Sequence, residues 1–500
     1  MTPPPGSRAA LAAAGTLAAM LGGTLSGCAV LAPPVPLPAR EAPALDAPST
    51  WQAPPAPQPA PAPQGPLQPG WTQFGDPLLL QLLDAAQAAS PDLAAARSRI
   101  EQARAASVAA GALLLPTLDA NGSASTGRAE IGMPRASFAA ANLQAGWELD
   151  LFGANRAGRD AALAQLLAAQ ASAAALGIAV AAETAASYNA LRGCEAVVLR
   201  TQADAQSRAE TARLTELVAN AGLSAPATAA LARASAAQGR SLLAGQQAQC
   251  ELLFKALVAM TALDDATLRQ RLQPGHARLP EPAAIAVPSV PAAALMQRPD
   301  LLAAEQQVVA AAAQTAQAQA RRYPRVAIAG SIGPAWMRME SLSADATLWT
   351  IGPLQVSLPL FDGGTRVANV VAARARYDEA VSVYRAALRT ALREVQTALI
   401  TLDATGRRIA DTEVSIEGFE ASLRAADARF RGGLGSLFDL EDARRSALLA
   451  QSTRVELQRE QVAAWINLYR ALGGGFSRGG ELAMAPALPA IPAIPATTQR

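Results

Sequence analysis

The stretch that decides the fold runs from Ala154 to Ala221 and begins ANRAGRDAALAQLLAAQASAAALGIAVAAETAASYNALRG. It contains no proline and is rich in alanine, the residue with the highest helix propensity. At about 1.5 Å per residue, a continuous helix of this length spans about 100 Å. Because so long a helix does not fit inside a small globule, we expect a coiled-coil rod or a structure that crosses a wide compartment.

The composition of the 500 residues excludes several classes of protein. Hydrophobic residues make up 51% but aromatic residues only 4%, so alanine supplies much of the apolar fraction and favours closely packed helices. The 42 Lys and Arg against 40 Asp and Glu give a net charge of +2, which offers no basic surface for nucleic acid. One histidine, and three cysteines without a CxxC pair, argue against catalytic triads and metal clusters. We therefore predict no catalytic residue, metal or cofactor.

Several short motifs in and around the long helical segment occur twice in the chain, in the same order, which predicts an internal duplication. Each copy reads helix, two short strands, long helix, tight turn and returning helix. The second long helix is expected over Thr365–Arg431. We place the first repeat at 71–275, a linker at 276–298 and the second repeat at 299–473. The paired landmarks are Pro91-Asp92-Leu93 with Pro299-Asp300-Leu301, Phe152 with Phe361, and Gly222-Leu223 with Gly433-Leu434.

Two segments alternate apolar and polar residues, as strands do. In Ala139–Phe152 one parity is largely apolar, and the segment around Leu354–Leu360 repeats the pattern. This alternation is typical of membrane β-barrel strands with lipid outside and water inside, although a half-buried soluble sheet alternates identically. On the barrel interpretation the lumen-facing polar residues are Asn142, Gln144, Glu148 and Asp150.

Four strands per chain, counting weaker partners near 117–126 and 325–336, cannot close a barrel. Bacterial barrels begin at about eight strands, and an open edge in lipid would leave its backbone groups without hydrogen bonds. The chain must therefore oligomerise, and three copies would supply twelve strands.

The N-terminus reads as a secretory signal. Residues 1–27 carry Arg8, an apolar run and then small residues. The segment ends in Leu25-Ser26-Gly27-Cys28, which resembles the bacterial lipobox and predicts lipidation of Cys28; the alternative is an uncleaved membrane anchor. Ala29 after the cysteine favours sorting to the outer membrane. The Pro-rich segment 28–70 is expected to be a tether, and 474–500 a disordered tail.

The cysteines give a local prediction. Gly222 and the Gly432-Gly433 pair permit tight reversals, because glycine adopts left-handed backbone angles freely. Cys194 precedes Gly222 by 28 residues and Cys250 follows it by 28, so the two lie level in an antiparallel hairpin. In the oxidising periplasm we expect a Cys194–Cys250 disulfide, the alternative being two buried thiols.

Four motifs, taken in order along the chain, resemble those of outer-membrane efflux lipoproteins of the TolC/OprM/NodT type. The similar motifs are Trp71–Pro77 (WTQFGDP), Trp147–Gly153 (WELDLFG), Arg298–Leu301 (RPDL) and Pro359–Gly364 (PLFDGG). The resemblance implies a mainly α-helical fold with membrane β-structure: a homotrimer with a twelve-stranded outer-membrane barrel and a helical periplasmic tunnel. It also implies docking, around the hairpin turns, on a periplasmic adaptor and an inner-membrane RND-type transporter, and export of drugs or other solutes without catalysis.

The resemblance further implies a gate at the second hairpin turn, in Ser436–Arg445. Phe438 is similar to an apolar ring residue and Asp442 to an acidic ring residue of the family, and residues four apart share one helical face. Asp439 lies between them and is a further candidate. The alternative is a solvated first turn favoured by the helix dipole.

Two other functions stay open at this point. A duct for secreted proteins of the type I class would use the same architecture. A structural coiled-coil lipoprotein that spaces the envelope would explain the lipobox and long helices, but not the paired strands.

Overall fold

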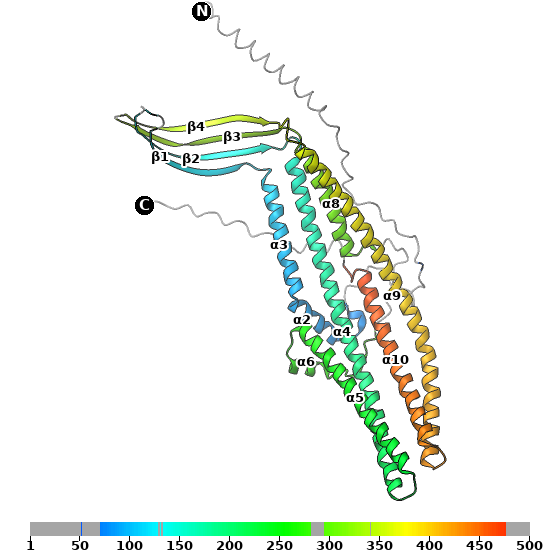
Figure 1. Cartoon of the computed structure of the whole chain (residues 1–500). Coiled ribbons are helices and arrows are strands. Elements are labelled where there is room, and N and C mark those ends of the chain that lie inside the picture. The colour runs from blue at the N-terminus through cyan, green and yellow to red at the C-terminus, as the bar shows by residue number, and fades with distance from the viewer. Residues whose placement is uncertain are drawn as a thin grey trace, which may run out of the picture. The chain divides into compact units, whose positions relative to one another are not determined.

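The computed structural model describes residues 52, 71–128, 131, 134–281, 295–340 and 342–476. The predicted lipidation site Cys28, most of the tether and almost all of the tail lie outside these residues. The chain divides into two compact units (Figure 1). Among the described residues, the sheet unit lies within Ala110–Ala161 and Ala311–Asp378, and the helical unit lies within 71–109, 162–310 and 379–476.

The order of elements is the same in the two halves of the chain. Both halves run helix, two strands, a helix of 67 residues and a returning helix of 36 or 35 residues. The first half contains α3 (Pro91–Ala112), β1 (Thr117–Gly127), β2 (Ala136–Leu149), α4 (Ala154–Asn220) and α5 (Pro226–Thr261). The second contains α8 (Pro299–Ala320), β3 (Arg325–Met339), β4 (Leu342–Ser357), α9 (Thr365–Arg431) and α10 (Leu437–Ala471). The first half adds η1 (Trp71–Phe74), α2 (Pro77–Ala89) and α6 (Asp265–Leu272).

The core of the helical unit lies where the short helices pack on the long ones. Leu79 and Leu82 of α2, Leu268 of α6 and Leu257 of α5 are buried with Leu399 of α9 in one cluster. Alanine dominates the rest of the buried surface along the long helices. Small side chains let helix axes approach closely, so these helices pack along their length rather than around a bulky centre.

A buried polar network connects the residue before α2 and the residues after α6 to α4. The Tyr188 hydroxyl donates to Asp76, which also caps α2, and accepts from the fully buried Arg192 guanidinium. Arg192 also donates to Glu195 and to the Pro274 carbonyl beyond α6. Burial raises the pKa of Tyr188 above its ordinary value, so the hydroxyl keeps its proton.

The sheet unit contains four antiparallel strands in the order β1-β2-β3-β4 (Figure 1). Successive strands pair through hairpins or, for β2 and β3, across the two halves of the chain. β1 and β4 are therefore edge strands, and their outer sides have no partner within the described chain. Gly333 lets β3 pass close to β2, since a Cβ at this position would lie 2.0 Å from the Ala141 carbonyl oxygen.

The register sorts the strand residues into two unlike faces, because directly paired residues point the same way. One face is polar except in the half nearer the hairpin ends, where it carries Phe138, Met337, Leu342 and Leu348, and the other face is apolar until it approaches the hairpin ends. The polar face carries Asp119, Asn121, Asn142, Gln144, Glu148, Arg325, Ser331, Thr350 and Gln355. The apolar face carries Leu118, Leu143, Trp147, Ile328, Ile332, Trp336, Trp349, Ile351, Leu354 and Val356.

The strand bounds differ from the expected ones at two places. β2 ends at Leu149, so Asp150 is not a strand residue. Its carboxylate instead accepts from the backbone N–H groups of Asn155 and Arg156 and caps the first turn of α4. β4 ends at Ser357, so the apolar–polar alternation that continues to Leu360 does not extend the strand.

Among the described residues, one helix has an 18-residue window apolar enough to cross a membrane by length and composition. This helix is α4, and 17% of the window is buried. A single such helix is weak evidence of a membrane span, because alanine-rich helices that pack along their length have the same composition.

Candidate functional site at the hairpin turns

The two long helices reverse direction at glycines. After α4, Gly222 has φ +75°, and after α9, Gly433 has φ +72°. Gly432 lies in the second turn without a positive φ, and its N–H donates to the Ala428 carbonyl at the end of α9. The predicted turn glycines therefore lie in the two turns, and only Gly222 and Gly433 need the left-handed conformation that glycine tolerates.

The returning helices begin differently. α5 starts at Pro226 after Ala225, which provides no side-chain cap. α10 starts with a capping box: the Asp439 N–H donates to Ser436 Oγ at 3.1 Å, and the Ser436 N–H donates to Asp439 Oδ2 at 3.3 Å. Hydrogen bonding to the Asp439 carboxylate from the Ser436 side chain, and then from the Ser436 N–H, lowers the pKa of Asp439 below its ordinary value. Asp439 thus stabilises the start of the helix.

Phe438 and Asp442 lie on the exposed face of the first turns of α10. The Phe438 side chain is 69% exposed and that of Asp442 is 65% exposed. Arg445 lies 3.7 Å from the Asp442 carboxylate, as an exposed ion pair three residues apart on the helix. An apolar ring and an acid one helical turn apart are therefore available to whatever approaches this face.

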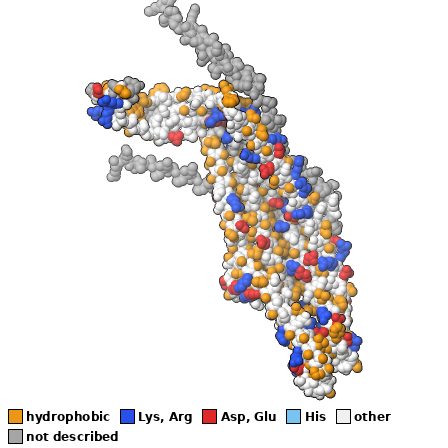
Figure 2. Space-filling view, in the orientation of Figure 1, with side chains coloured by type: hydrophobic (Ala, Val, Ile, Leu, Met, Phe, Trp, Pro, Cys, Tyr) orange, Lys and Arg blue, Asp and Glu red, His pale blue; other side chains and the backbone are white. Residues whose placement is uncertain are grey.

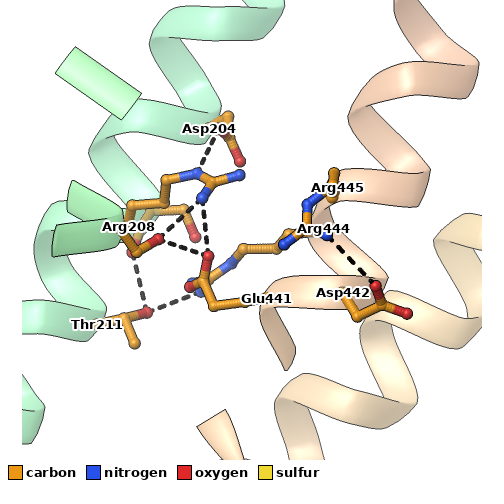
Figure 3. Close-up of polar contacts among 9 residues, drawn as sticks. Asp204, Arg208, Thr211, Glu441, Asp442, Arg444 and Arg445 are labelled. Carbon is orange, nitrogen blue, oxygen red and sulfur yellow. Dashed lines mark hydrogen bonds and ion pairs between the residues drawn. The ribbon is translucent and has the colours of Figure 1, made fainter. Parts of the chain in front are cut away.

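The buried side of α10 holds an ionic network, drawn in Figure 3. Glu441 accepts from Arg208 of α4 at 2.8 Å, from Ser235 of α5 at 2.6 Å and from Arg444 at 2.8 Å. Arg444 also donates to Thr211 of α4 at 2.8 Å. A single carboxylate thereby links α10 to both helices of the first hairpin.

The network is neutral overall and tightly enclosed. Arg208 also pairs with Asp204 at 2.7 Å, so two acids and two arginines alternate. Glu441 and Arg444 are each only 6% exposed. A Cβ at Gly239 of α5 would lie 2.9 Å from Arg208 Cδ, so the glycine makes room for the arginine stem. Desolvated charges of this kind are tolerated only when each is paired.

Sequence reasoning singled out Asp439 and Asp442 at the start of α10 but missed the residues of the first hairpin that bind Glu441. Asp204, Arg208 and Thr211 are spaced by four and three residues, which places them on one face of α4. A polar stripe of this spacing on an alanine-rich helix was the available signal. The sequence did not show that α10 is the partner of this stripe, because no local pattern relates α4 to α10.

Farther from the turn of the first hairpin, Cys194 of α4 and Cys250 of α5 form a disulfide with their Cα atoms 5.6 Å apart. The lumen candidates on the sheet are also placed: Asn142, Gln144 and Glu148 share its polar face. Gln144 accepts from Asn121 at 3.4 Å, and Glu148 pairs with Arg325.

Comparison with known proteins gives the same picture. The family described as outer membrane efflux protein matches residues 82–263 and 290–474. The outer membrane protein OprJ of Pseudomonas aeruginosa is 33% identical over 344 residues, which cover 68% of this chain and 70% of that protein. The toluene efflux pump outer membrane protein TtgI of Pseudomonas putida is 30% identical over 415 residues, covering 81% and 87%. The crystal structure of the outer membrane protein VceC from Vibrio cholerae superposes with a TM-score of 0.70 at 29% identity, covering 82% of this chain and 100% of that one.

The fold and these similarities define an outer-membrane channel protein with a helical tunnel and barrel strands. The chain belongs to the outer membrane efflux protein family.

Proposed function

We propose that three copies of this chain form a passive outer-membrane duct that exports small molecules, such as drugs and toxic solutes. The observation that carries this proposal is the sheet, in which one face is largely apolar, the other carries most of the polar side chains, and the outer sides of β1 and β4 have no partner among the described residues. A sheet of this kind is stable in lipid only when its edges are closed by other copies. Three copies provide twelve strands with the apolar face toward lipid.

On this arrangement the polar face lines the water-filled lumen. Asn142, Gln144 and Glu148 then contact the passing solute, while the apolar faces contact outer-membrane lipid. The paired Glu148 and Arg325 offer both signs of charge. Such a lumen sets few chemical requirements, so selectivity belongs to the protein that delivers the solute.

The partners follow from the proposed duct. A periplasmic adaptor and an inner-membrane RND-type transporter would feed the helical end around the turns at Gly222 and Gly433, and lipid on Cys28 would anchor the chain. No step in this function requires chemistry by the channel itself. The relatives support the proposal, since TtgI is named as the outer membrane protein of a toluene efflux pump.

Phe438 and Asp442 form the gate of the duct in this proposal. Three copies of each around an axis would give an apolar constriction followed by an acidic one, which attracts cations and resists other solutes. The exposed pair with Arg445 holds Asp442 only weakly, because surface ion pairs contribute about 0–1 kcal/mol. The buried network on the other face of α10 fixes the backbone that presents both residues.

The gate is tested by conductance. Asp442→Ala removes the three carboxylates, so we expect higher single-channel conductance in planar bilayers and greater antibiotic leakage into cells. Glu456→Ala is the matched control, since Glu456 is also an exposed acid of α10 paired with an arginine three residues later. Unchanged conductance in Asp442→Ala, or an equal rise in the control, would contradict the assignment of the gate.

Two alternatives have separate outcomes. A duct for a type I protein secretion system would give the same pores, and the transporter encoded beside this gene separates it from a drug pump. An envelope-spacing lipoprotein would give no pores at any voltage or pH.

A further inference from the structure

The apolar face of the sheet changes character toward its hairpin ends. Beyond Trp336 the next residues on this face form a polar row across all four strands. The row consists of Thr126, Ser137, Arg338 and Ser343, which are directly paired from β1 to β4. Figure 2 shows basic side chains gathered at this end of the sheet, and in the sequence these are arginines.

The length of the apolar band indicates where this polar row lies relative to the membrane. Ten residue steps separate Val326 from Trp336 on β3, and at about 3.3 Å per residue they cover about 33 Å. At a strand tilt of about 40° this corresponds to about 25 Å along the membrane normal, the height of the apolar band of outer-membrane barrels. Arg338 therefore lies just beyond the hydrocarbon, at the level of the lipid head groups.

Two further arginines reach the same level. Arg135 lies just before β2, and its guanidinium Nε donates to Thr126 Oγ1 at 3.3 Å, so it joins the row. Arg128 follows the end of β1 and is exposed. The exposed Arg338 stands between Ser137 and Ser343, whose hydroxyls are additional donors. The described acids of this region are Asp345, which lies one step inward on the same face, and Glu340 in the turn between β3 and β4.

We propose that Arg128, Arg135 and Arg338 form a binding surface for the phosphorylated head groups of outer-leaflet lipid. The surface has the chemistry for this ligand: guanidinium groups bind phosphate oxygens through paired N–H groups, and the flanking hydroxyls donate further hydrogen bonds. Its position has the matching geometry, since it lies on the face that contacts lipid and directly above the apolar band. The inference rests on the proposed membrane orientation, in which the hairpin ends face outward.

The test uses the full-length channel purified in detergent and a fluorescent phosphorylated outer-leaflet glycolipid as the probe. We expect Arg338→Gln to weaken binding severalfold, and the triple variant Arg128→Gln/Arg135→Gln/Arg338→Gln to weaken it at least about tenfold. Arg321→Gln is the matched control: it is an exposed arginine of the same unit, just before β3 at the opposite end of the sheet, and should bind as the wild type does. Arg338→Lys should restore part of the affinity.

Several results would overturn the proposal. These are unchanged binding in the triple variant, equal loss in Arg321→Gln, equal binding of the dephosphorylated lipid, or complete competition by inorganic phosphate at the lipid's own concentration. Conductance measured on the same preparations separates this outcome from failure of the proposed function. If the triple variant both conducts and binds lipid as the wild type does, only the proposed lipid surface is refuted. If the wild-type protein forms no pores, the proposed duct is refuted.

Discussion

At the scale of single residues, Glu441 contributes most to the geometry of the candidate site. Its two carboxylate oxygens accept from arginines on two different helices and from Ser235 on a third. Asp442, its neighbour in sequence, is exposed and makes one loose contact. Adjacent acids thus have different roles because a helix turns them to different sides.

We predict that Glu441→Ala loosens the hairpin turns. It leaves Arg208 and Arg444 buried without their shared carboxylate, and breaking a buried pair in this way costs about 3–5 kcal/mol. At about 1.4 kcal/mol per factor of ten, hydrogen exchange in the first turns of α10 should accelerate by two orders of magnitude or more. Glu413→Ala, which breaks only an exposed pair with Arg454, should leave that exchange unchanged. Similar exchange in both variants would show that the network does not hold the turn.

At the scale of elements, the first hairpin has a covalent link that the second lacks. Cys194 and Cys250 close a loop with a sequence separation of 56 residues. On the chain-entropy account, a loop of this length stabilises the folded hairpin by about 4 kcal/mol. The second hairpin contains no cysteine, so α9 and α10 depend on non-covalent contacts: packing, ion pairs and hydrogen bonds such as that from Gln451 to Glu420.

Reduction should therefore weaken one hairpin only. We expect dithiothreitol, or the double variant Cys194→Ser/Cys250→Ser, to lower the unfolding temperature and to speed hydrogen exchange in α4 and α5. Dithiothreitol should have no further effect on the double variant, which is the control. If both thiols of the untreated protein can be alkylated, the disulfide is absent and this expectation fails.

The sheet has its own sensitive position. Gly333 faces the β2 backbone, and a Cβ there would lie 2.0 Å from the Ala141 carbonyl oxygen and 2.5 Å from the Asn142 Cα. Gly333→Ala should force β2 and β3 apart at a cost of at least about 1–3 kcal/mol, measured as reduced yield of folded, heat-resistant protein. Gly122→Ala on β1 has no atom within 4 Å of the added Cβ and should fold normally. Equal yields from both variants would argue against this β2–β3 pairing.

At the scale of the whole molecule, the proposed duct requires more than one chain. Native mass spectrometry of protein extracted from the outer membrane should give three copies per particle, because the unpaired sides of β1 and β4 need partners in lipid. Disruption of the detergent micelle should release monomers only with loss of the sheet. A particle of one or two chains that still conducts would contradict the twelve-stranded arrangement.

The sequence predicted the helices closely and the strands less closely. The expected Ala154–Ala221 helix is α4 to within one residue, and Thr365–Arg431 is α9 as expected. Helix-forming residues and turn glycines act locally, so these bounds are readable from the chain alone. The strand alternation was read through Phe152, but β2 ends at Leu149 because the Asp150 carboxylate caps the next helix. Alternation shows which residues can share a face and does not show where pairing stops.

By itself the sequence determined two long helical hairpins, their turn positions and two alternating strand segments. It also determined that Cys194 and Cys250 lie side by side in the first hairpin. All of these depend on propensity, period and counting along the chain. Only the tertiary structure decided which polar residues meet: Glu441 with Arg208, 233 residues away, and Arg338 with the hydroxyl row of the neighbouring strands. The physical reason is that a buried charge or a cross-strand row is defined by packing between distant segments, and no local pattern encodes the partner.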